Sequence, residues 1–388
     1  MNRHLLIPVL TQTAVGGLFI NLAPVTPHLI RELGATYGDV GMVTTLFILG
    51  QVLAGLLAGY FSDRFGVKRI YVAANICTVL LAVLLAGAQT IQQILFLRFF
   101  LGFAMGTQFV VGSSYLAFWS PPEKTALYQG IYGGGFNFGI ALSFFLAAPQ
   151  VSWLGWRGVY LVPGVACFLS TLYLCVAGRE PAEKPSGQAL SPRDFRHLPI
   201  QPLVLLGVGM TAAWATFIVL GAWLTEYLMV AQRSAFWLSS VLTGINVAGS
   251  GIGRILGGAV ARPGRETRAV LWFYFIVIAA AAALLFSSSV IVILTLAALV
   301  AMVSSMGFAP LMRLAIQVGG PRLQGTAVGL VLALGMLIGS VLPTLFGWVV
   351  GVTGSFTMGF LVVLAAPLTG FLAMLRFQSR CAPEQKNL

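Results

Sequence analysis

The sequence predicts an all-α membrane protein with twelve transmembrane helices. Of its 388 residues, 58% are hydrophobic and only 8% are charged, whereas soluble domains carry about 25% charged residues. The apolar residues fall in runs long enough to cross a bilayer, for which a helix needs about 20 residues. A soluble core cannot bury this much apolar surface, so lipid must solvate much of the chain.

Each predicted helix is one apolar run that ends at a short polar or glycine-containing turn. The runs lie at 5–29, 40–61, 70–88, 92–118, 125–148, 156–177, 201–230, 237–261, 269–288, 290–318, 324–350 and 353–376. The longest polar segment separates the first six runs from the last six. The sequence therefore predicts an N-terminal half at 1–177, an exposed cytoplasmic linker at 178–200 and a C-terminal half at 201–388.

The basic residues predict the orientation, because cytoplasmic loops carry an excess of Lys and Arg. With a cytoplasmic N-terminus, seventeen of the 22 basic residues fall on the inner side and three, Arg31, Arg157 and Arg233, on the outer side. We therefore expect a multi-pass protein of a bacterial inner membrane with both termini in the cytoplasm. The net charge of +12 is spread over short turns without a basic, aromatic patch, so nucleic acid is not an expected partner.

A shift of 199 residues aligns the two groups of helices. It pairs Gly50 with Gly249, Gly59 with Gly258, Arg69 with Arg268, Pro122 with Pro321, Gly130 with Gly329, and Gly155 with Gly354. This repeat predicts two pseudo-symmetric six-helix halves. Internal repeats of this kind occur in secondary transporters, which bind substrate between the repeats near the middle of the bilayer.

The turn after the second run is rich in charge. It reads Gly59, Asp63, Arg64, Gly66, Lys68 and Arg69 at a spacing of glycine-x-x-x-aspartate-arginine-x-glycine-x-basic-basic. This spacing resembles the signature of the major facilitator superfamily (MFS) at every position. Arg98 with its following glycines, and the segment 155–158, resemble further motifs of the superfamily. The resemblance covers nearly the whole chain and implies an MFS fold, transport by alternating access and a monomer.

The resemblance also implies conformational roles at the charged turn, for Gly59, Asp63, Arg64, Gly66 and Arg69. In the superfamily the aspartate engages the inner end of helix eleven, here residues 324–325, where the helix dipole favours an anion. Arg98 is a further gating candidate. It lies about eight residues from the centre of its run, which predicts a place near the outer face where snorkelling is easy. Structural support and gating both stay open for it.

The most informative charge inside a predicted helix is Arg254. It lies about 8 Å from the centre of helix eight, at 1.5 Å per residue, and an arginine there must face a cavity or a partner because lipid would cost about 2.5–3.5 kcal/mol. A guanidinium fork suits a carboxylate or a similar oxyanion. Gly253-Arg254-Ile255-Leu256-Gly257-Gly258 resembles helix eight of the oxalate–formate antiporters, monocarboxylate transporters and nitrate porters, where the arginine binds substrate. Carbonyl partners or snorkelling remain the alternative.

Helix five reads Gly133-Gly134-Gly135-Phe136-Asn137-Phe138-Gly139, which resembles the nitrate signature except at Phe136. The nitrate porters also carry an arginine on helix two where this chain has Gly55, so nitrate itself is not the expected substrate. Asn137 can donate a hydrogen bond to an anion or to a neighbouring helix. Further candidates at similar depths are Tyr132, Gln108, Asn246 and Trp214.

These residues predict a carrier of a small anion, with an organic carboxylate as the favoured substrate and a proton or a counter-anion as the coupling partner. All ten acidic residues lie in loops, in tails or near helix ends, and proton-driven export of cations needs a buried acid. Proton-coupled efflux of drugs or other amphipathic compounds is the alternative, and a channel or receptor is a third possibility. No nucleophile–base set, phosphate loop or metal-ligand spacing is present, so neither enzymatic activity nor a cofactor or metal is expected.

Overall fold

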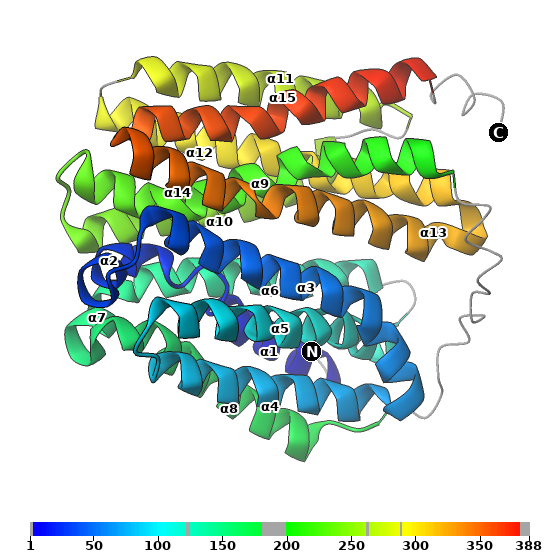
Figure 1. The fold of residues 1–388 in the computed structure, drawn as a ribbon. Coiled ribbons are helices and arrows are strands. Elements are labelled where there is room, and N and C mark those ends of the chain that lie inside the picture. The colour runs from blue at the N-terminus through cyan, green and yellow to red at the C-terminus, as the bar shows by residue number, and fades with distance from the viewer. Residues whose placement is uncertain (1–2, 122–124, 181–198, 261–263, 288, 381–388) are drawn as a thin grey trace. The chain divides into compact units, whose positions relative to one another are not determined.

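The computed structural model describes residues 3–121, 125–180, 199–260, 264–287 and 289–380, and these residues form helices and turns without a strand (Figure 1). The first eight helices are α1 Arg3–Gly16, α2 Thr26–Leu33, α3 Tyr37–Phe65, α4 Val67–Ala86, α5 Ile91–Trp119, α6 Thr125–Phe145, α7 Ala147–Leu154 and α8 Gly158–Ala177. The others are α9 Ile200–Val230, α10 Phe236–Val260, α11 Glu266–Phe286, α12 Val290–Met306, α13 Phe308–Ser340, α14 Leu342–Thr353 and α15 Phe356–Arg380. Two 3₁₀ turns, η1 Ala23–Val25 and η3 Gly155–Arg157, complete the order.

The all-α membrane fold predicted from the sequence is confirmed. Nine helical segments among the described residues are long and apolar enough to cross a bilayer. Helix α13 runs through the predicted turn at 318–324, but its backbone is non-helical at Gly320, with φ 63° and ψ 178°. Glycine adopts this positive φ without the steric cost that other residues meet, so two helices join at the predicted place.

The first predicted helix, 5–29, is not continuous in the structure. Helix α1 ends at Gly16, and a turn leads through η1 into α2. Pro24 and Pro27 occupy the opening positions of η1 and α2, where proline is tolerated because its missing N–H would have no partner there. The prediction of one uninterrupted helix was therefore wrong, and the break leaves backbone carbonyls that need other partners.

The contacts divide the chain into two compact units. Unit 1 comprises Met1–Ser186 and Ala222–Gly244, and unit 2 comprises Gly187–Gly221 and Ile245–Leu388. The connected ends of α9 and α10 thus belong to unit 1. The halves predicted at 1–177 and 201–388 remain a prediction, and most of the predicted linker lies outside the described residues.

Within unit 1, α3 packs against α5, α4 against α5 and α8, and α1 against α6 and α8. Small residues allow this close packing. A Cβ atom at Gly102 would collide with the backbone of Phe47 on α3, and one at Gly139 would collide with Thr13 on α1. In unit 2, α11 packs against α12, α13 and α15, and Gly253 and Gly257 of α10 abut the backbone of Met302 and Met306.

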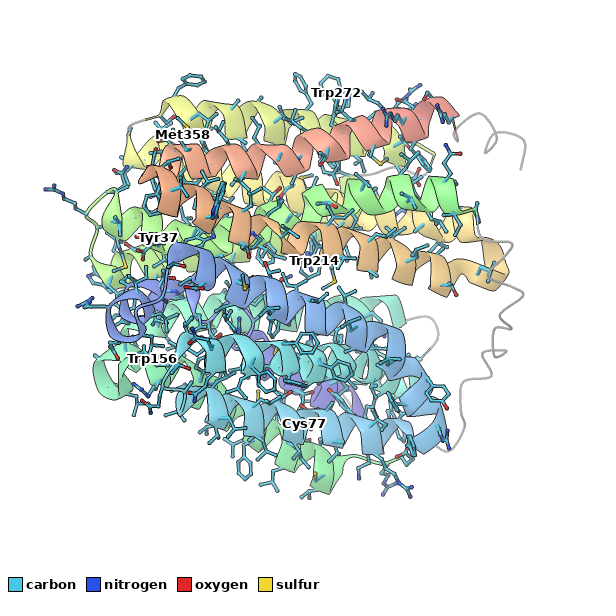
Figure 2. The ribbon with its side chains drawn as sticks, in the orientation of Figure 1. Tyr37, Cys77, Trp156, Trp214, Trp272 and Met358 are labelled. Atoms are coloured by element: carbon cyan, nitrogen blue, oxygen red, sulfur yellow. The ribbon has the colours of Figure 1, made fainter. Side chains whose placement is uncertain are left out.

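Large apolar side chains cover the outer faces of the helices. Trp272 of α11 is 65% exposed and points away from its unit (Figure 2). Phe96 on α5 and Phe286 on α11 are also strongly exposed. Water does not tolerate contiguous surfaces of this kind, whereas hydrocarbon does, so these faces contact lipid.

Candidate functional site

Arg254 lies in an aromatic cage within unit 2. Its Cζ atom is 5.0 Å from the ring centroid of Trp214, 5.9 Å from that of Phe217 and 4.8 Å from that of Phe308. Trp214 and Phe217 stand three residues apart on α9, which places them on one face of that helix, and Phe308 begins α13. Rings from two helices, α9 and α13, therefore surround the guanidinium of Arg254 on α10.

The cage does not neutralise the charge of Arg254. Its Nε and Nη2 atoms are buried without a hydrogen-bond partner. Among the described residues, acidic side chains form ion pairs with Arg157 and Arg313 but not with Arg254. Cation–π contacts stabilise a desolvated guanidinium by about 2 kcal/mol or more, but they leave its charge and its N–H donors available to an anion.

A line of polar residues precedes Arg254 on α10. Asn246, Ser250 and Arg254 follow one another at intervals of four, which places them on one side of the helix. The Ser250 hydroxyl donates to the carbonyl of Val247 at 2.6 Å, whereas both side-chain polar atoms of Asn246 are buried without a hydrogen-bond partner. The amide of Asn246 therefore stays a candidate for binding a ligand.

The other three substrate candidates lie in unit 1. The Tyr132 hydroxyl donates to the carbonyl of Phe109 at 3.0 Å and is 3.4 Å from that of Gln108. The Gln108 side chain is fully buried, and Asn137 is 5% exposed with its Oδ1 atom lacking a hydrogen-bond partner. Tyr132 thus ties α6 to α5, and the amide groups of Gln108 and Asn137 stay candidates for a ligand.

Arg98 is completely buried in unit 1 rather than snorkelling near the surface. Its Nη1 donates to the carbonyl of Leu18 at 2.8 Å and to Oδ1 of Asn21 at 3.2 Å, and its Nη2 donates to the carbonyl of Phe19 at 2.8 Å. The Phe47 ring centroid lies 4.6 Å from its Cζ.

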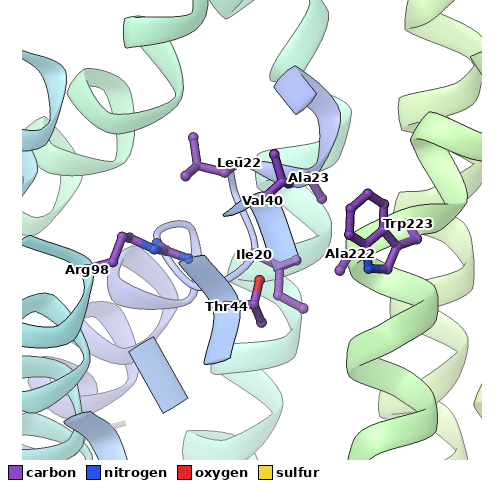
Figure 3. A pocket seen from close by; sticks show the side chains of 8 residues that line it. All are labelled: Ile20, Leu22, Ala23, Val40, Thr44, Arg98, Ala222 and Trp223. Carbon is purple, nitrogen blue, oxygen red and sulfur yellow. The ribbon is translucent and has the colours of Figure 1, made fainter. Parts of the chain in front are cut away.

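These acceptors belong to the break between α1 and η1, so Arg98 satisfies the backbone that the break leaves unpaired. Figure 3 shows Arg98 beside a small cavity of about 10 Å³, which is lined by Ile20, Leu22, Ala23, Val40, Thr44, Arg98, Ala222 and Trp223. This cavity is too small for a substrate. The surroundings of Arg98 thus provide structural partners, in contrast to those of Arg254.

The charged turn predicted for gating joins α3 to α4. Gly66 has φ 98° and its N–H donates to the carbonyl of Ser62. The Arg64 Nη1 donates to the Tyr60 hydroxyl at 2.9 Å, and Arg69 is exposed. The side chains of Asp63 and Gln324 and the surroundings of Gly59 and Gly325 lie outside the part that the structure describes, so the expected contact of Asp63 stays a prediction.

Three groups at the sites escaped the sequence analysis. Phe217 and Phe308 complete the cage, and only the spacing of Phe217 from Trp214 could have pointed to one of them. Tyr37 donates a hydrogen bond to Glu226 at 3.2 Å, and no sequence pattern predicts this pairing across 189 positions. Glu226 is 1% exposed, so the expectation that the chain offers no buried acid was wrong. Among the described residues no group of three or more His, Cys, Asp or Glu could hold a metal ion.

Comparison with known proteins identifies the family. The sequence profile of the Major Facilitator Superfamily matches residues 9–343. A probable sulfoacetate transporter, SauU of Cupriavidus necator, is 24% identical over 383 residues, which cover 92% of this chain and 89% of that protein. A probable nitrate/nitrite antiporter, NarK1 of Thermus thermophilus, is 25% identical over 378 residues, which cover 89% of this chain and 84% of that protein.

The fold is also similar to a solved structure. A bacterial homologue of the human lysosomal transporter Spinster, in an inward-facing and unoccupied conformation, matches with a TM-score of 0.77 and 18% identity, covering 97% of this chain and 96% of that chain. This likeness concerns the fold alone. The apolar helices, the charged turn and the family profile together show that the chain belongs to the Major Facilitator Superfamily and is a multi-pass membrane transporter, not an enzyme.

Proposed function

We propose that this transporter moves a small organic anion across a bacterial inner membrane by alternating access, and that Arg254 binds the charged group of the substrate. The observation that carries the proposal is a guanidinium in an aromatic cage, two of whose nitrogen atoms are buried without a hydrogen-bond partner. An uncompensated charge in such a place is costly, and an oxyanion that accepts from both nitrogen atoms offsets that cost.

The relatives support the same class of substrate. The similar proteins are named for sulfoacetate and for nitrate or nitrite, all of which are oxyanions. A substrate with a carboxylate or sulfonate at one end matches the planar fork of Arg254. Asn246 is the proposed hydrogen-bond partner of a second polar group, and Trp214 is the proposed apolar contact of the substrate. Asn137, Tyr132 and Gln108 remain proposed substrate residues of unit 1.

Export of cationic drugs fits this site less well, because the charge of Arg254 repels a cation at close range. Coupling is proposed to occur through a proton that moves with the substrate or through exchange for another anion. The working unit is proposed to be a monomer.

A thermal-shift screen of the purified protein tests the proposal, since a ligand that binds the native state raises its apparent stability by about 2.7 kcal/mol at a concentration of 100 times Kd. Suitable probes are sulfoacetate, acetate, benzoate and nitrate, each beside a cationic or neutral compound of similar size. We expect at least one carboxylate or sulfonate to raise the melting temperature. Stabilisation by cationic amphiphiles with no response to any anion would reverse the order of the two hypotheses.

The orientation is proposed from the distribution of basic residues, with both termini and the linker at 178–200 in the cytoplasm. Protease added to sealed right-side-out vesicles should then leave the linker intact, because the membrane protects it, and should cut it after permeabilisation. The products are followed by immunoblotting of a C-terminal tag, with a known cytoplasmic-side protein as the control for sealing. Cleavage in intact vesicles would show that the proposed orientation is inverted.

A further inference from the structure

Glu226 is a buried carboxylate that the proposed anion site does not use. It lies near the end of α9, in unit 1, and is 1% exposed. Its Oε1 atom accepts a hydrogen bond from the Tyr37 hydroxyl of α3 at 3.2 Å, whereas its Oε2 atom is buried without a hydrogen-bond partner. The Tyr37 ring packs 5.9 Å from that of Trp223, one turn earlier on α9.

Among the described residues, Glu266 is the other buried acid, and its surroundings differ from those of Glu226. Glu266 is 2% exposed and lies 3.5 Å from Nη1 of Arg313. Among the described residues, no Lys, Arg or His forms an ion pair with Glu226. A buried carboxylate that pairs with a cation stays ionised, whereas one without a cation becomes neutral by binding a proton.

None of the charged and titratable groups described on α2, α3 and α9 supplies a cation that pairs with Glu226. Tyr37 faces it from α3, and Tyr227 follows it on α9, where its hydroxyl accepts from Gln232 at 2.7 Å. On α2, the ring of His28 packs against Phe236 at 6.2 Å, and Glu32 pairs with Arg157 at 3.9 Å and accepts from Trp156. Asp39 of α3 caps its own helix through Thr36. Among the described residues, no ion pair joins Arg31 of α2 to Glu226.

We propose that Glu226 is the proton-binding site through which the transporter takes up a proton with its anionic substrate. A hydronium ion transfers its proton to Oε2 and leaves as water, so that an O–H bond forms at Oε2, while Tyr37 keeps its own proton and continues to donate to Oε1. The carboxylic acid so formed is neutral and suits its buried place. When water reaches the carboxyl group during the transport cycle, the same O–H bond breaks and the proton passes to a water molecule.

This inference rests on the proposed anion transport for its role in coupling, because a proton offsets the charge of one carboxylate substrate. The assignment of the site itself does not depend on the identity of that substrate. Infrared difference spectroscopy of the wild-type protein in lipid vesicles can therefore test the proton-binding site without a ligand. The measurement compares the C=O band of protonated carboxylic acids in acidic and in alkaline buffer.

Three variants make the infrared test specific. Glu226→Gln preserves the size and the acceptor for Tyr37 but cannot ionise, Tyr37→Phe removes the hydrogen bond, and Glu266→Gln is the matched buried-acid control. We expect a carboxylic-acid band that is present in the wild type at neutral pH, lost in Glu226→Gln, shifted in frequency in Tyr37→Phe and retained in Glu266→Gln. A band that persists unchanged in Glu226→Gln would overturn the assignment.

Coupling is tested on the same vesicles with a trapped pH-sensitive dye and sulfoacetate as the probe anion. We expect sulfoacetate uptake to acidify the interior of wild-type vesicles and not of Glu226→Gln vesicles, while Glu226→Gln still exchanges labelled for unlabelled sulfoacetate. Acidification by the variant would refute the coupling role. If sulfoacetate neither binds nor enters the vesicles, the anion proposal fails for this probe, and the coupling role fails with it. The infrared experiment still decides whether Glu226 binds a proton.

Discussion

Replacing Arg254 with alanine is expected to remove anion binding from a protein that still folds. The substitution deletes the one positive charge within the cage of Trp214, Phe217 and Phe308. Truncating one partner of a desolvated charge pair costs about 2–5 kcal/mol, which corresponds to a loss of affinity of about 30- to 4,000-fold. Since Arg254 makes no ion pair within the described residues, its removal leaves no acidic partner stranded in the folded protein.

Arg254→Lys separates the charge from the shape of the group. Lysine keeps the positive charge and can still lie against the aromatic rings, but it lacks the planar fork that binds an oxyanion through two nitrogen atoms. We therefore expect an affinity between those of the wild type and Arg254→Ala. Calorimetric titration with the anion that gives the largest thermal shift measures all three proteins.

Arg268→Ala is the matched control, because Arg268 is exposed in the first turn of α11 in the same unit. It removes the same charge from the chain and should leave binding unchanged. Melting temperatures measured on the same preparations distinguish a binding role from a structural one. Normal affinity in a well-folded Arg254→Ala protein would end the anion-carrier hypothesis and place drug export first.

The sequence predicted the helices well, because a bilayer imposes a simple length and composition on each span. It failed at 5–29, where apolar residues continue without interruption across the break between α1 and η1. A hydropathy pattern reports where lipid or protein surrounds the chain, not whether each backbone group is paired. Pro24 and Pro27 were the local signals, but proline is tolerated in transmembrane helices and did not by itself predict a break.

The sequence pointed to part of the aromatic cage, whereas the binding role of its residues stays a prediction. Arg254 and Trp214 were chosen separately for their depth, and the structure places them in contact. Phe308 is one of 27 phenylalanines, so nothing in its local sequence distinguishes a ring of the cage from one that faces lipid. The environment of Arg98 was missed for a related reason, since its acceptors exist only because the first helix breaks.

The second large effect is expected on stability, from Arg98→Ala. The side chain donates to the carbonyls of Leu18 and Phe19, which lie between α1 and η1. Leaving a buried acceptor unsatisfied costs about 1–3 kcal/mol for each group, so the loss of both should destabilise the protein by about 2–6 kcal/mol. Thermal unfolding in detergent, followed by tryptophan fluorescence, should show a lower melting temperature and a lower yield of folded protein.

Two further variants separate support of the broken helix from gating by Arg98. Asn21→Ala removes the amide that accepts from Arg98 at 3.2 Å and donates to the carbonyl of Val159 at 2.7 Å, so it should destabilise the same segment by a smaller amount. Arg157→Ala removes a partly exposed arginine whose contact with Glu32 is 3.9 Å, and surface pairs contribute only about 0–1 kcal/mol. We therefore expect the smallest decrease in melting temperature for Arg157→Ala, a larger one for Asn21→Ala and the largest for Arg98→Ala. The folded fraction of each variant should retain the affinity for anions. An Arg98→Ala protein that melts like the wild type but no longer transports would instead assign the guanidinium to gating, because its hydrogen bonds would then stabilise one conformational state rather than the fold.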